Sequence, residues 1–61
     1  MLANEAIEHL EKIISDCQQA LKELGQGNKR RSIGLIDEIE HDAEAAKWLL
    51  INQVIDEEGE F

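Results

Sequence analysis

The stretch that decides the fold is IEHLEKIISDCQQALKELGQGNK, residues 7–29. Its apolar residues recur at intervals of three and four, which is the repeat of an α-helix with one apolar side. In a heptad frame with Ile7 at position a, positions b, c, e and f between residues 8 and 23 are all polar. The stretch therefore predicts an amphipathic helix over residues 4–24, with one apolar stripe at positions a, d and g that packs against a second helix. The a and d residues are Ala3, Ile7, Leu10, Ile14, Cys17, Leu21 and Leu24, and the g residues are Ala6, Ile13 and Ala20.

Helix-boundary signals divide the chain into two helices. Asn4 is a plausible N-cap for the first helix, and Gly25 suits the left-handed position after a helix end. Residues 25–28, GQGN, then predict a short turn, which extends to Ser32 if the second helix starts near 33 rather than near 29. The second helix runs to about 57, and an acidic tail covers 58–61. Residues 1–61 are thus predicted to form one all-α antiparallel helical hairpin.

The second helix carries two apolar stripes, and one hairpin cannot cover both. The first stripe matches the first helix and consists of Ile36, Ile39, Ala43, Ala46 and Leu50, with Gln53 at the last d position and Leu35 and Leu49 flanking it. The second lies outside that seam. Exposed contiguous apolar surface usually marks an interface, so this stripe predicts a homodimer seam or a docking face for a different protein. Its residues are Trp48, Ile51 and Ile55, with Leu49 and Val54 beside them.

Chain length favours self-association. A domain of 61 residues with one cysteine cannot form an internal disulfide, and chains this small are marginal without a disulfide, a metal or oligomerisation. We therefore expect two hairpins to pair into a homodimeric four-helix bundle. Whether the hairpins pair parallel or antiparallel stays open.

Charge and composition disfavour several kinds of partner. Fourteen acidic residues against six basic ones give a net charge of −8, which repels nucleic acids and anionic membranes and suits a basic or apolar protein surface. No apolar run approaches the roughly 18 residues of a membrane span. The lone thiol and the acidic N-terminal segment predict a cytoplasmic protein without membrane contact.

Lys29, Arg30 and Arg31 form the one basic cluster of the sequence. If the second helix packs antiparallel to its copy, this cluster approaches the acidic residues 56–58 of the other chain. The hypothesis is that these charges fix the orientation of a dimer. The alternative is contact with anions such as phosphates, but three charges without an aromatic platform are a weak nucleic-acid signal.

The motif with the most specific chemistry is Glu38–x–x–His41, a spacing found in carboxylate-bridged di-iron helices. Such a site needs both side chains inward and a carboxylate from the facing helix. The heptad frame places both outward, and it predicts a surface position for His9 and a buried one for Cys17. We therefore predict no catalytic residue, no metal site and no cofactor.

These observations predict a small, acidic, non-enzymatic protein that acts through protein–protein contacts or regulation as a homodimeric bundle. Two alternatives remain at the level of sequence. The first is an acidic inhibitor that imitates nucleic acid and blocks a basic protein. The second, less favoured, is an RNA-binding hairpin that uses the basic cluster.

Overall fold

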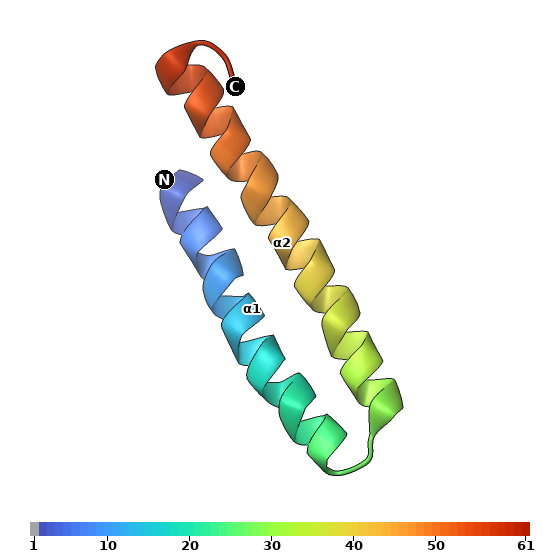
Figure 1. Ribbon diagram of the computed structural model, residues 1–61. Coiled ribbons are helices and arrows are strands. Elements are labelled where there is room, and N and C mark those ends of the chain that lie inside the picture. The colour runs from blue at the N-terminus through green and yellow to red at the C-terminus, as the bar shows by residue number, and fades with distance from the viewer. Residues whose placement is uncertain (1) are drawn as a thin grey trace.

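A computed structural model of the chain describes the backbone of residues 2–61 and the side chains of residues 5–61. It contains two helices, α1 (Leu2–Gly25) and α2 (Lys29–Glu58), which lie antiparallel and side by side (Figure 1). The predicted all-α helical hairpin is confirmed. The end of α2 extends beyond the start of α1, so the hairpin has a closed end at the turn and an open end where only α2 continues.

The helix boundaries follow from the turn chemistry. α1 begins at Leu2, before Asn4, whose side chain lies outside those described. The prediction that Gly25 adopts the left-handed conformation is wrong, because Gly25 is the last residue of α1 and Gly27 has the positive φ of 79°. The amide of Asn28 donates to the Glu23 carbonyl at 2.8 Å. α2 then begins at Lys29, the earlier of the two starts considered.

The hairpin is only one helix thick. Its extents are 48 × 16 × 11 Å, and an α-helix with its side chains is about 10–12 Å across. Among the described side chains, the buried hydrophobic residues are three alanines, Ala6, Ala20 and Ala46. The hairpin alone therefore encloses no core of large apolar side chains. Neither helix, over the residues described, has an apolar segment long enough to cross a membrane.

The surface where α1 meets α2, here called the interhelix seam, differs from the predicted one. On α1 its residues are buried or half-buried at positions g and c of the heptad frame, not at a and d. The predicted apolar stripe of the first helix therefore faces the second helix through its g residues, Ala6, Ile13 and Ala20. Its described a and d residues are turned away from the second helix, and that part of the prediction is wrong. The alanines allow close approach of the helices, and polar groups bridge them. The seam consists of Ala6, His9, Ile13, Asp16, Ala20 and Glu23 on α1, and Ser32, Leu35, Ile39, Asp42, Ala46 and Leu49 on α2.

The register of the seam is fixed by contacts along its length. The Ser32 hydroxyl is buried and donates to the Ala20 carbonyl at 3.2 Å near the closed end. His9 and Asp42 meet nearer the open end. The same register places Ala46 opposite Ala6, where two small side chains face each other.

Candidate functional site

The apolar stripe of α1 lies in solvent. Its large side chains are 45–70% exposed, with Leu10 the least and Leu21 the most exposed. Cys17 is also exposed, so the prediction of a buried thiol is wrong for the single hairpin. This result follows from the seam, because the g and c positions face α2 and turn the a and d positions outward. The exposed stripe comprises Ile7, Leu10, Ile14, Cys17, Leu21 and Leu24.

α2 extends this apolar surface on the same side of the hairpin. A residue that follows a seam residue by one position is turned by about 100° from it. The helices are antiparallel and their seam sides face each other, so the residues one position after the seam residues lie on the same side of the hairpin in both helices. Ile14, after Ile13, and Ile36, after Leu35, are examples. The two stripes therefore form one surface, here called the broad apolar face. Its α2 residues are Ile33, Ile36, Ala43, Leu50 and Val54, with Glu40 and Lys47 between them.

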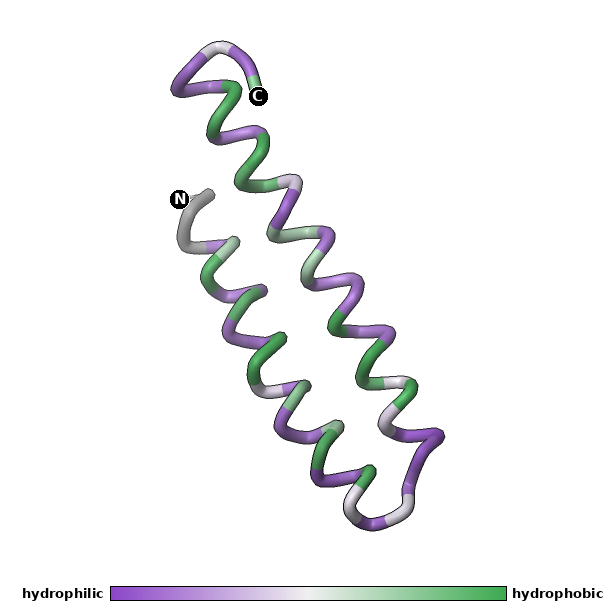
Figure 2. The backbone as a smooth tube through the Cα atoms, viewed as in Figure 1, coloured by the Kyte–Doolittle hydropathy of each residue, from purple (hydrophilic) through white to green (hydrophobic). Residues whose placement is uncertain are grey.

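Hydropathy along the backbone shows the same division (Figure 2). Apolar residues recur along the coloured part of α1, whereas α2 begins and ends with hydrophilic residues and has more strongly apolar segments on either side of a largely hydrophilic middle. The sequence reasoning missed the exposure of this face. The available signal was the column of small residues, Ala6 and Ala20 on one side of α1 and Ala46 on α2, which permits a close helix contact.

The three main residues of the predicted interface, spaced i, i+3 and i+7, lie on one side of the continuous helix α2, whereas the two residues predicted beside them lie elsewhere. Trp48 and Ile55 are 52% and 42% exposed and lie on the side of α2 that faces away from the broad apolar face. Leu49 is half-buried in the seam, and Val54 lies on the broad apolar face. Ile51 is half-buried and points away from α1. The Lys47 ammonium is 5.6 Å from the centroid of the Trp48 ring, close enough for a cation–π contact.

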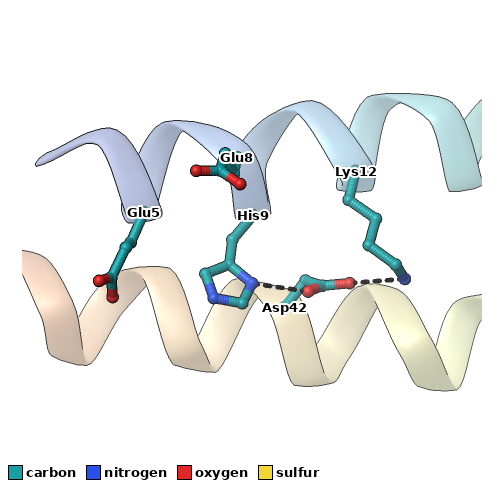
Figure 3. A pocket seen from close by; sticks show the side chains of 5 residues that line it. All are labelled: Glu5, Glu8, His9, Lys12 and Asp42. Atoms are coloured by element: carbon teal, nitrogen blue, oxygen red, sulfur yellow. Dashed lines mark hydrogen bonds and ion pairs between the residues drawn. The ribbon is translucent and has the colours of Figure 1, made fainter. Parts of the chain in front are cut away.

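A polar cluster crosses the seam towards the open end (Figure 3). Asp42 lies between His9 and Lys12, and its side chain is only 12% exposed. The His9 Nδ1–H donates to Asp42 Oδ1 at 2.8 Å, and Lys12 Nζ donates to Asp42 Oδ2 at 3.0 Å. Lys12 also reaches Asp16 at 3.1 Å and Glu38 at 3.7 Å. The prediction that His9 is a simple surface residue is therefore wrong.

These contacts shift two proton equilibria. The hydrogen bond from His9, followed by that from Lys12, holds the pKa of Asp42 below its ordinary value. The hydrogen bonds to Asp42 and Asp16 raise the pKa of Lys12 above its ordinary value. Both shifts favour the charged forms, so Lys12 and Asp42 form an ion pair at neutral pH. The role of the cluster in the geometry is to hold α1 against α2.

A second polar cluster ties the turn to the closed end. Glu23 is 8% exposed and accepts hydrogen bonds from Gln19 Nε2 at 2.9 Å and Asn28 Nδ2 at 3.0 Å. Arg31 Nε lies 3.5 Å from the same carboxylate. Asn28 occupies the N-cap position of α2, but its side chain bonds to Glu23 rather than capping the helix. Of the predicted basic cluster, Arg31 thus contacts its own chain, and Lys29 and Arg30 are exposed.

The Glu38–x–x–His41 motif does not assemble a metal site. His41 Nε2 lies 4.0 Å from Asp37 on the exposed side of α2, and Glu38 points towards Lys12. Over the described residues, no three His, Cys, Asp or Glu side chains are grouped so that they could hold a metal ion.

Comparisons with protein-family models, curated proteins and solved structures found no match to the chain. The function is therefore inferred from the residues and their geometry.

Proposed function

We propose that the chain is a small, non-enzymatic protein–protein interaction module that works as a homodimer, two hairpins pairing through the broad apolar face into a four-helix bundle. The observation that carries this proposal is the exposure of the α1 stripe. Monomeric proteins rarely expose contiguous apolar surface of this kind, and such surface marks interfaces. Two hairpins, each one helix thick, would enclose between them the core that a single hairpin lacks.

The surface area of the hairpin supports this proposal. The hairpin has an accessible surface of 4753 Å². A compact monomer of 6.9 kDa is expected to expose about 4,000 Å². The excess, about 750 Å², is close to the roughly 800 Å² that each partner buries in a standard stable interface. A second copy would therefore bring the exposed area per chain to the level of a compact protein.

The decisive experiment compares the solution mass of the wild-type chain with that of Ile14→Asp. Ile14 is 59% exposed at the middle of the stripe, so the substitution costs the isolated hairpin little beyond helix propensity. At a dimer interface it buries an unpaired charge in each copy. We expect a wild-type dimer by light scattering and a dimer Kd raised about 100-fold or more in the variant.

Ser15→Asp is the matched control, because it introduces the same charge at the next residue, which is exposed and lies outside the stripe. The control is expected to remain dimeric. A monomeric wild type, or an Ile14→Asp variant that dimerises as tightly as Ser15→Asp, would contradict the proposal.

A dimer formed in this way leaves Trp48 and Ile55 on its outside. We propose this pair as the contact point for a different protein, since exposed tryptophan is a frequent centre of binding energy. Acidic residues flank the pair at Glu44 and Asp56, so a partner with a basic, partly apolar surface suits it. The same acidity is what supports the alternative of an inhibitor that imitates nucleic acid. RNA binding has less support, because Arg31 contacts Glu23.

A further inference from the structure

Charge is distributed unevenly along the hairpin. Residues 17–36, which form the closed end, contain four basic residues and one acidic residue. The remaining chain contains thirteen acidic residues and two basic ones. One end of the rod is therefore positive, and the rest is strongly negative. If two copies pair with their turns at the same end, their like-charged regions lie together. If they pair with their turns at opposite ends, the positive end of each copy lies against a negative region of the other.

The charge pattern of α2 is also complementary to the same pattern read in reverse. Reversal about the point between Ala43 and Glu44 brings residues 29–31 against residues 56–58, a basic run against an acidic one. It also brings Glu40 against Lys47. Within residues 29–58, reversal creates four pairs of opposite charge and no pair of like charge.

The residues of α2 on the broad apolar face follow the same symmetry. Ile33 corresponds to Val54, Ile36 to Leu50 within one position, and Ala43 nearly to itself. Ile33, Ile36 and Leu50 are 65%, 47% and 43% exposed, and Ala43, Glu40 and Lys47 are exposed as well. In a two-fold interface, if residue i of one copy contacts residue j of the other, then residue j of the first copy also contacts residue i of the second. The surface must therefore be complementary to itself.

We infer that the two hairpins pair with their turns at opposite ends, with α2 lying antiparallel on the partner's α2 and the two-fold axis passing near Ala43. This inference rests on the proposed homodimer and adds its orientation and register. Glu40 then faces the partner's Lys47, and Ile33 faces the partner's Val54. The small side chain of Ala43 allows the two helices to approach at the axis.

Disulfide trapping tests this register, with Cys17→Ser as the background that removes the native thiol. In that background Ala43→Cys places two thiols beside each other across the axis, within the roughly 4.4–6.8 Å Cα separation that a disulfide needs. We expect Ala43→Cys to form a covalent dimer under mild oxidation. Ile33→Cys and Val54→Cys are expected to stay uncrosslinked alone and to crosslink when mixed and co-refolded. Pairing with turns at the same end predicts none of these crosslinks.

Charge reversal gives a test without cysteines. Glu40→Lys creates two symmetric repulsions with the partner's Lys47 and is expected to weaken the dimer by about 3- to 30-fold at low salt. Adding Lys47→Glu restores opposite charges and should restore the affinity. A double variant, Glu40→Lys with Lys47→Glu, that dimerises as weakly as Glu40→Lys alone would overturn the register.

The outcomes separate the two proposals. A Cys17→Ser dimer that is not trapped by Ala43→Cys overturns the orientation but leaves the proposed homodimer standing. A Cys17→Ser chain that is monomeric at the same concentration overturns both.

Discussion

The two long sides of α1 differ in a way that hydrophobic pattern alone does not suggest. The side that faces α2 carries Ile13, two alanines and the polar residues His9, Asp16 and Glu23, whereas the side that faces solvent carries the other large apolar side chains that the structure describes, all of them exposed. Polar contacts are specific in geometry but contribute modestly to stability, and apolar burial contributes most. The seam therefore fixes how the two helices align, and the broad apolar face holds the larger share of the available burial energy.

The largest effect on the seam is expected from Ala46→Leu. Ala46 is 3% exposed and lies opposite Ala6, so three added carbons have no space without separating the helices. We expect a loss of about 1–3 kcal/mol in unfolding free energy, measured by denaturant unfolding at a fixed protein concentration. Ala46→Ser is the control, since a similar small side chain is already tolerated in the seam at Ser32. Equal stability of the leucine and serine variants would mean that the helices are not closely packed here.

A smaller effect is expected from the turn. Gly27 has a φ of 79°, a conformation that costs a residue with a side chain about 1–2 kcal/mol. Gly27→Ala should lower stability by that amount. Gly34 lies within α2 with open space around it, so Gly34→Ala should instead raise stability by about 0.5–1 kcal/mol. Thermal unfolding of the two variants should therefore shift in opposite directions, and shifts of the same sign would contradict the turn geometry.

The polar cluster of the seam predicts a dependence on pH. The pKa of Asp42 is lower in the folded chain than its ordinary value. The stabilisation that Asp42 contributes to the folded state is therefore complete above the unfolded pKa of about 3.9. It is lost as the pH falls through the folded pKa. Asp42→Asn should lower the melting temperature at neutral pH and reduce the additional loss in acid. Glu44→Gln is the control, because Glu44 is exposed and lies outside the cluster. Identical pH profiles of the Asp42→Asn variant and the wild type would exclude a stabilising role for the cluster.

The smallest effect is expected at Trp48. Because Trp48 lies outside the broad apolar face, Trp48→Asp should leave the dimer mass and melting temperature nearly unchanged. Light scattering of this variant beside Ile14→Asp separates the two exposed apolar surfaces. Loss of the dimer in Trp48→Asp would instead assign the homodimer contact to the stripe first expected from the sequence.

Periodicity predicted the two helices, their antiparallel arrangement and the turn. It did not predict which side of α1 faces α2, because an apolar stripe has the same repeat whether its partner helix belongs to the same chain or to another. Glu23 and Asp42 were also missed as inward residues, since their burial depends on Arg31, Asn28, His9 and Lys12 arriving from elsewhere in the chain. Charge patterns reveal such pairings only after the register is known.

The thickness of 11 Å has a consequence for amide hydrogen exchange. In a single hairpin every backbone amide lies within one helix radius of water, so protection would come only from the helical hydrogen bonds and would fade from the helix ends. Association would create an interior for the first time. The appearance of slowly exchanging amides as protein concentration rises would therefore report the formation of a core that the chain cannot build alone.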